Sequence, residues 1–513
     1  MRIYRPKWTC GRYSENGKVA IYYNLLEGMS YLFEDISAYV ISVLLSIPRD
    51  SCMSLIDISK QTGVSEDSLV PFFQELKDLG LITDHRYGDE EIKQYRSSVK
   101  DMHTFASNNN TSTNRFKSPM SNTTVEMDYE YKAGGITSVM FELTYRCSAM
   151  CIHCYNVGAT RNNTEISHRD NKEELSFEEY KRIIDELYEQ GLTKVCLSGG
   201  DPFSKSCMWQ IIEYLYQKEI AFDVFTNGLQ LANQVDRLAN YYPRLVGISI
   251  YSGHADIHDS ITRVQGSWNK SMSIVKALTS LAVPTVLKCC IMSPNVLTYH
   301  EVDDLAKKYG AITQYELNVT DSVEGDKCVS KYLRLPQYLL EVVLRDNRTP
   351  MYVGEEVTNY GEHLNPLDKN ACGAGKNTFC LTPDGDFIAC VAFHKSFGNV
   401  KDRKINDLLN DNSDLTSWQK LTLQQYEECG RHDYCSYCFP CPGNNYSEHK
   451  NELLAAENNC YMAKCRFHVA EQMKNGKDPL CGKSVLNRLI EIAPKNYQIP
   501  AIKRIFSLED ISG

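Results

Sequence analysis

Six short apolar runs alternate with helical segments between residues 136 and 340, and this alternation constrains the fold more than any other feature of the sequence. The runs are SVMFELTY, KVCLS, FDVFT, LVGISIYS, TVLKCCIM and TQYELNV. One helix between them is well marked, because Ser176 is placed as its N-cap and Glu179 as the capping-box partner. Strands alternating with helices predict a parallel sheet, and six repeats predict an α/β fold wrapped into a partial (βα)6 TIM-like barrel.

Cysteines and glycines follow these strands, at the carboxyl ends where barrels of this kind carry their chemistry. RCSAMCIHC follows the first strand, SGGDP the second, TNG the third and SIYS the fourth. The first motif spaces Cys147, Cys151 and Cys154 as C-x3-C-x2-C, which gives a tetrahedral zinc ion only three ligands unless a fourth, such as His153, is added. A [4Fe–4S] cluster has four irons, so three thiolates would leave one iron open for a substrate or cofactor.

The cysteine triplet, with an aromatic residue before its last cysteine and a strand before its first, resembles the signature of radical S-adenosylmethionine (SAM) enzymes. The resemblance implies that the three cysteines hold a [4Fe–4S] cluster whose open iron is chelated by the amino and carboxylate groups of SAM. It also implies a set of SAM-binding residues, namely His153, Tyr155, Gly199, Gly200, Asp201, Thr226, Asn227, Ser249 and Arg263. Among these, Asp201 would contact the methionine amine, although the family usually has the longer Glu at this position.

Ten of the 20 cysteines lie in the C-terminal part of the chain, where they resemble a SPASM domain, a family that carries two auxiliary [4Fe–4S] clusters. The resemblance implies the ligands Cys372, Cys390, Cys429, Cys435, Cys438, Cys441 and Cys460, with Cys380, His432 and Cys465 as alternates. His432 stands where the family has the second cysteine of a C-x2-C pair. A zinc ribbon is the alternative, but ten cysteines exceed the eight that two tetrahedral zinc ions use.

Residues 1–83 follow the order of a winged helix-turn-helix. Ser65 precedes a helical pattern that Gly80 ends, and its apolar residues share one face: Leu69, Phe72, Phe73 and Leu76. Eight Lys or Arg against ten Asp or Glu suit phosphate binding poorly, so the pattern favours a peptide, which would pair with a free strand edge, over DNA. The module resembles the RiPP recognition element, which binds the leader of a ribosomally synthesised precursor peptide.

The remaining segments complete the expected organisation. Residues 84–135 are polar and predict a flexible linker, residues 136–340 the barrel, residues 341–371 a bridging region, residues 372–482 the SPASM domain, and residues 483–513 a C-terminal helix or tail.

Bulk properties limit location and partners. A net charge of −10 argues against a nucleic-acid partner. The N-terminus MRIYRPKWTC lacks the apolar core of a signal peptide, and the longest apolar run, ISAYVISVLLSI, is too short and too interrupted by serine to cross a bilayer. A cytoplasmic location follows, where thiols stay reduced and cysteines serve metal or cluster binding.

Taken together, the chain resembles a radical SAM/SPASM peptide maturase. The resemblance implies that a 5′-deoxyadenosyl radical installs a crosslink in a core peptide, first of all a cysteine thioether, with carbon–carbon or carbon–oxygen crosslinks or epimerisation as alternatives. A flavodoxin or ferredoxin would supply the electron. An anaerobic sulfatase-maturing enzyme and an iron–sulfur redox-sensing DNA-binding regulator are the other hypotheses.

Overall fold

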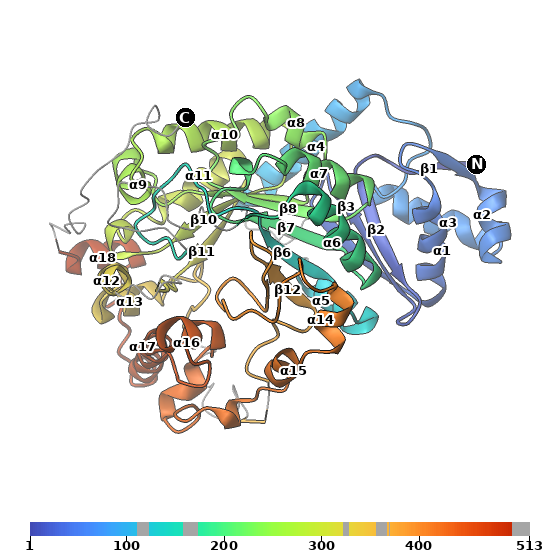
Figure 1. Cartoon of the computed structure of the whole chain (residues 1–513). Helices are drawn as coiled ribbons and strands as arrows, with labels where there is room; N and C mark the ends of the chain where they lie inside the picture. The colour runs from blue at the N-terminus through green and yellow to red at the C-terminus, as the bar shows by residue number, and fades with distance from the viewer. Residues whose placement is uncertain (110–122, 157–172, 322–327, 355–366, 369, 495–513) are drawn as a thin grey trace.

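The computed structural model describes residues 1–109, 123–156, 173–321, 328–354, 367–368 and 370–494 (Figure 1). Three parts follow one another along the chain: an N-terminal module, a barrel and a cysteine-rich region. None of the helices in these ranges is long and apolar enough to cross a membrane.

The barrel is confirmed. Its six parallel strands are β6 (Ser138–Glu142), β7 (Lys194–Ser198), β8 (Ala221–Thr226), β9 (Leu245–Ser249), β10 (Thr285–Cys290) and β11 (Ile312–Glu316). The helices between them are α6 (Phe177–Glu189), α7 (Met208–Gln217), α8 (Val235–Ala239), α9 (Ala255–Thr262), α10 (Ser267–Ser280) and α11 (Glu301–Tyr309). The expected capping box of Ser176 and Glu179 starts α6, whose Tyr180, Ile183 and Leu187 are buried.

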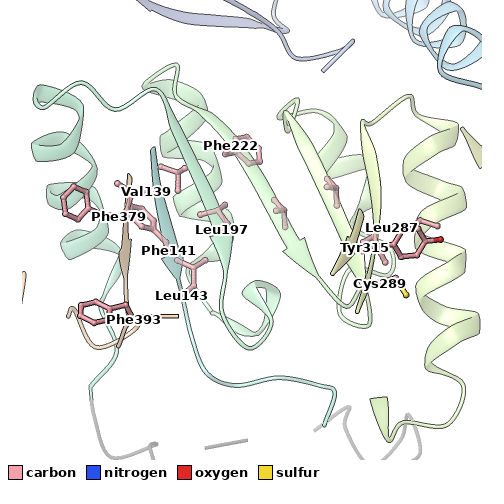
Figure 2. Packing of buried hydrophobic residues seen from close by; sticks show 14 of the residues in the cluster. Val139, Phe141, Leu143, Leu197, Phe222, Leu287, Cys289, Tyr315, Phe379 and Phe393 are labelled. Carbon is pink, nitrogen blue, oxygen red and sulfur yellow. The ribbon is translucent and has the colours of Figure 1, made fainter. Parts of the chain in front are cut away.

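The cysteine-rich region continues the barrel sheet, which the sequence did not predict. Strand β12 (Thr378–Leu381) pairs parallel with β6, and β13 (Phe387–Ile388) pairs antiparallel with β12, so the sheet has eight strands in the order β11-β10-β9-β8-β7-β6-β12-β13. Figure 2 shows Phe379 of β12 beside Val139 and Phe141 of β6 in one core. The two regions therefore share a sheet and a core.

Seven α-helices lie in the described remainder of the C-terminal half. They are α12 (Cys328–Leu333), α13 (Gln337–Val343), α14 (Ile405–Asn410), α15 (Ser413–Gln419), α16 (Pro442–His449), α17 (Glu457–Lys474) and α18 (Val485–Ile492).

The N-terminal module has a three-stranded antiparallel sheet of β2 (Thr9–Ser14), β3 (Val19–Asn24) and β4 (Met29–Glu34), in that order. Helix α1 (Asp35–Ser46) packs on this sheet, and α2 (Leu55–Thr62) and α3 (Glu66–Asp78) follow. A small pair, β1 (Arg2–Tyr4) with β5 (Cys52–Ser54), completes the module. Ser65 caps α3 as expected, and the winged-helix assignment stays a prediction.

The prediction of a flexible linker over residues 84–135 is wrong for the two ends of that segment. Helix α4 (Asp89–Asn109) packs against α10 and α11, and α5 (Thr123–Ala133) packs against β3 and β4. Their Ile92, Val99 and Tyr129 are buried. A few apolar side chains at helical spacing are enough to dock a helix on an existing surface, although the segment is polar overall. Residues 110–122 lie outside the described residues.

Ion pairs at the amino ends of the barrel strands hold the N-terminal module and helix α5, which packs on it. Arg5 forms a bidentate ion pair with Glu219, which lies two residues before β8. Glu126 of α5 pairs with Lys194, the first residue of β7, at 2.5 Å and with Arg244, which precedes β9, at 3.3 Å. Burial works against ionisation of Glu126, but Arg244 and Lys194 outweigh it and lower its pKa. The expected chemistry lies at the opposite, carboxyl ends of the same strands.

Candidate active site

The two glycines after β7 pack against the backbone that leads into Cys147. Gly200 N donates to Thr144 O at 2.6 Å, and Asp201 N donates to Arg146 O at 2.9 Å. A Cβ on Gly199 would lie 2.4 Å from Thr144 O, and a Cβ on Gly200 would lie 2.4 Å from Arg146 O. Gly199 also has φ of +126°. Only glycine fits at both positions, so the motif fixes the start of the cysteine loop.

The cysteine loop brings three thiols together at the carboxyl end of β6. Burial raises the pKa of Cys151 to about 12, with the Cys154 thiol as the next cause. Burial, followed by Asp201 and the other two thiols, also raises the pKa of Cys147 well above its ordinary value. Ala149 N donates to Cys147 Sγ at 3.4 Å. Buried thiols that cluster in this way are protonated without iron and become ligands when a cluster supplies positive charge.

The loop is fastened on its other side to the end of α9. Met150 N donates to Thr262 O at 3.0 Å, and Ile152 N donates to Ile261 O at 2.9 Å. The next residue, Arg263, has a left-handed φ of +61° and is buried. The structure thus places Arg263 beside the cysteine loop.

An aromatic layer lies beside the cysteine loop. The ring of His153 makes an edge contact with Tyr251, with centroids 4.7 Å apart, and Tyr251 stacks on His258 at 5.5 Å. Tyr251 N donates to His258 Nδ1 at 3.2 Å, and burial lowers the pKa of His258 to about 4. Ser249 interacts with the Tyr251 side chain. The sequence did not identify Tyr251 and His258 as site residues, because only their positions in the fold, Tyr251 beside His153 and His258 beside Tyr251, distinguish them.

Asp201 is fully buried, and its carboxylate faces three donors of its own chain. Oδ1 accepts from Phe203 N at 3.0 Å, and Oδ2 accepts from Thr226 Oγ1 at 2.6 Å and from Asn227 N at 3.0 Å. Burial nevertheless raises the pKa of this carboxyl. The carboxylate therefore joins the turn after β7 to the loop after β8.

The interior of the barrel carries further polar groups that the sequence did not single out. Glu142 is buried at the end of β6, and the side chains of Tyr155 and Cys380 lie close to it. Lys288 of β10 lies 3.6 Å from the ring centroid of Phe225 and donates to Gln314 at 3.0 Å. Burial lowers the pKa of Lys288. The sequence could not identify these residues, because which side chains face the barrel interior depends on the register of the strands.

Seven of the C-terminal cysteines form two sets. The inner cysteine set contains Cys372, Cys390 and Cys441. Burial is the main cause that raises the pKa of Cys390 to about 12, and the nearby thiols of Cys441 and Cys372 raise it as well. Backbone donors face two of its sulfurs, with Ala374 N at 3.4 Å from Cys372 Sγ and Asn444 N at 3.5 Å from Cys441 Sγ. Hydrogen bonds of this kind favour thiolate ligands.

The outer cysteine set contains Cys429, Cys435, Cys438 and Cys460. Burial and the other three thiols raise the pKa of Cys438 to about 12, and burial with Cys435 and Cys460 raises that of Cys429 to about 11. Among the described residues no three His, Cys, Asp or Glu side chains converge as they would on a single metal ion.

The three alternates lie in different surroundings. Cys380 lies in the barrel interior beside Cys390 and Glu142. His432 stacks on Tyr434 with centroids 4.9 Å apart and pairs with Glu428 at 3.7 Å. Cys465 is buried beside Tyr461 and Glu341. Cys380 is thus next to Cys390 of the inner cysteine set, and the backbone of His432 is next to the outer set, since Cys435 N donates to His432 O at 2.9 Å.

Comparison with known families agrees with this arrangement. Residues 141–309 match the Radical SAM superfamily, and residues 372–442 match SPASM, an iron–sulfur cluster-binding domain. The chain thus contains a radical SAM domain and a SPASM domain, and it is a radical SAM enzyme. Its cofactors are SAM with a [4Fe–4S] cluster and the auxiliary iron–sulfur clusters of the SPASM domain.

The chain is also similar to individual known proteins. The antilisterial bacteriocin subtilosin biosynthesis protein AlbA of Bacillus subtilis is 25% identical over 330 residues, which cover 61% of this chain and 70% of AlbA. The mycofactocin maturase MftC of Mycobacterium tuberculosis is 28% identical over 320 residues, which cover 58% of this chain and 76% of MftC. The crystal structure of Streptococcus suis SuiB bound to the precursor peptide SuiA has a TM-score of 0.49 and 13% identity, and the match covers 90% of this chain and 100% of that chain.

Proposed function

We propose that this enzyme is a peptide maturase that binds the leader of a ribosomally synthesised precursor on its N-terminal module and crosslinks the core peptide at the barrel mouth. The carrying observation is that, within the described residues, strand β4 of the N-terminal module pairs on one side only, and that Arg5 of this module forms an ion pair with Glu219 of the radical SAM barrel. The relatives AlbA and MftC, named for bacteriocin biosynthesis and mycofactocin maturation, support a peptide substrate.

The leader would add a strand to β4. Within the described residues β4 pairs on one side only, with β3. Phe33 at this edge makes an edge contact with Phe72 of α3, with centroids 6.0 Å apart. Ile36 and Tyr39 of the adjoining helix α1 are exposed. An extended peptide on this edge would gain main-chain hydrogen bonds from β4 and apolar contacts from these side chains.

Each cysteine group has a proposed cluster. Cys147, Cys151 and Cys154 would hold the cluster that binds SAM, and the outer cysteine set would complete a four-cysteine auxiliary cluster. The inner cysteine set would hold the second auxiliary cluster, with Cys380 or a group of the peptide at its fourth iron. His153, Tyr155, Ser249 and Arg263 would line the SAM pocket.

Bound SAM supplies a 5′-deoxyadenosyl radical once a flavodoxin or ferredoxin has provided an electron. The preferred product is a thioether: the core peptide loses a hydrogen atom from carbon, its cysteine loses a proton, a carbon–sulfur bond forms and one electron leaves. Auxiliary clusters would accept that electron. The residues at the barrel mouth would then orient the core peptide and exclude water. Carbon–carbon or carbon–oxygen crosslinks would lose the same two hydrogens.

Anaerobic reconstitution tests the proposal. We expect about twelve iron atoms per chain and, with dithionite, SAM and a precursor peptide, a product lighter by two hydrogen atoms whose cysteine resists alkylation. The variant with Cys147, Cys151 and Cys154 all changed to Ala should form no 5′-deoxyadenosine. Zinc instead of iron, or an unchanged peptide despite SAM cleavage, would contradict the maturase proposal.

Leader binding is tested separately on the full chain. Phe33→Ala combined with Phe72→Ala should weaken binding of a labelled leader peptide by at least about tenfold, while Ile56→Ala, an exposed change on α2, should leave it unchanged. Specific duplex DNA binding at physiological salt by the same protein would favour the regulator hypothesis. If the enzyme oxidised a cysteine of a protein substrate equally well with and without the two Phe→Ala substitutions, a sulfatase-maturing activity would be favoured.

A further inference from the structure

Asn227 is held in one orientation at the carboxyl end of β8. Its backbone N–H donates to Asp201 Oδ2 at 3.0 Å, and its main-chain O accepts from Ser271 Oγ at 2.7 Å. Its side-chain Oδ1 accepts from Leu229 N at 2.8 Å. Because Oδ1 is committed to a backbone donor, the amide group cannot be reversed without losing that bond, and Nδ2 must point the other way.

In this orientation Nδ2 donates to a sulfur of the cysteine loop. The distance from Asn227 Nδ2 to Cys147 Sγ is 3.3 Å, and Ser148 Oγ lies at the outer limit of the same donor at 3.5 Å. Cys147 is thereby faced by two donors, this amide and the backbone N–H of Ala149.

Asp201 holds this donor in place. Its Oδ2 accepts from both Thr226 Oγ1 and Asn227 N, and Thr226 Oγ1 in turn accepts from Gly228 N at 3.0 Å. The carboxylate therefore fixes three consecutive residues of the loop. A longer glutamate in the same buried space would push this loop away, which gives a physical reason for the shorter residue in this chain.

We infer that Asn227 raises the reduction potential of the cluster bound through Cys147, and that Asp201 is the residue that positions it. A hydrogen bond to a cluster thiolate stabilises the reduced state, which carries more negative charge, over the oxidised state. Asn227 thus tunes electron entry through its hydrogen bond to Cys147 rather than binding SAM.

The test is an anaerobic redox titration of the full chain without SAM, followed by EPR spectroscopy. The signal that is absent from the triple alanine variant of Cys147, Cys151 and Cys154 belongs to the SAM-binding cluster. At a fixed potential, Asn227→Ala should lower the ratio of reduced to oxidised cluster roughly fivefold. Asn227→Asp keeps the acceptor for Leu229 N but removes the donor and adds charge, so it should lower this ratio further.

Ser271→Ala is the matched control, because it releases the Asn227 main chain and leaves the Nδ2 donor intact. Its ratio should equal that of the wild type. Unchanged ratios in both Asn227 variants, together with weaker SAM binding, would overturn the inference and make Asn227 a SAM ligand. Loss of iron from both variants with native circular dichroism would also overturn it, since Asn227 would then hold the cluster rather than tune it.

Discussion

Single atoms decide whether the cysteine loop is correctly placed, and glycine at position 200 is the clearest case. Gly200→Ala would bring a Cβ to 2.4 Å from Arg146 O and 2.6 Å from Tyr145 O, both backbone atoms that cannot turn aside. We expect a loss of about 2 kcal/mol in the free energy of unfolding and a lower iron content in the first cysteine loop. Iron analysis and anaerobic denaturation measure both.

Gly88→Ala is the control for this prediction. A Cβ at Gly88 meets only Glu91 Oε2, at 3.7 Å, and the residue is exposed. Its stability and iron content should stay at wild-type values. Equal behaviour of the two variants would show that the Gly-Gly turn does not fix the loop.

His258 gives the fold a predictable dependence on pH. Burial lowers its folded-state pKa to about 4, well below the ordinary value of 6.5, and Tyr251 N donates to its neutral ring. The unfolded chain therefore binds a proton below pH 6.5 that the folded chain does not, and stability falls as pH drops toward the folded pKa. Between pH 7.5 and pH 5 the loss is about 2 kcal/mol.

Urea denaturation at the two pH values measures this loss. His258→Gln removes the titrating ring, so the difference between the two pH values should shrink by about 2 kcal/mol relative to wild type. His254→Gln, at an exposed position, is the control for a general histidine effect. An undiminished difference in His258→Gln would assign the pH dependence to other groups.

At the scale of elements, α4 is a structural part of the barrel rather than a tether. Val99 is fully buried, and Arg96 on the same helix donates to Leu281 O at 2.6 Å and to Ala239 O at 2.8 Å. Val99→Ala should lower the free energy of unfolding by about 1–2 kcal/mol, whereas the exposed Ser97→Ala should change it little. Denaturation of both variants measures the contrast, and equal stabilities would return this segment to the role of a linker.

The sequence predicted elements well where their own pattern is strong and poorly where distant contacts decide. All six barrel strands and the Ser176 cap follow from local periodicity and spacing. Strand β12 has only four residues and is stabilised by pairing with β6, more than 200 positions earlier, so no local signal identifies it. The same applies to α4, whose apolar residues gain burial only from the barrel surface.

The cysteines show the same limit at the site. The motif spacing indicated which residues are ligand candidates, but Cys438 and Cys441 are three residues apart and belong to different sets. Cys372 lies near Cys441, the N-cap of α16, although 69 positions separate them in the sequence. Grouping therefore depends on the tertiary fold, and so does the contact between Asn227 and Cys147.

At the scale of the whole molecule, the proposed function places leader binding and radical chemistry at opposite ends of the barrel strands. Arg5 of the N-terminal module and Glu126 of α5 form ion pairs at the amino ends of the strands, whereas the cysteine loop lies at their carboxyl ends. A strand of six residues such as β8 is about 20 Å long. A peptide bound to β4 must therefore cover at least this distance along the outside of the barrel before its core reaches the mouth.

This separation predicts a minimum spacer in the precursor peptide. Since an extended residue spans about 3.3 Å, at least about six residues must lie between the leader segment that pairs with β4 and the residue that loses hydrogen. Precursors shortened below this length should bind with unchanged affinity, measured by anisotropy, and yield no crosslinked product in mass spectrometry. A control with the same number of residues removed after the core should be modified normally. Full modification of the shortened precursor would mean that the leader binds elsewhere than on β4, or that the core is supplied by a peptide bound to a second molecule.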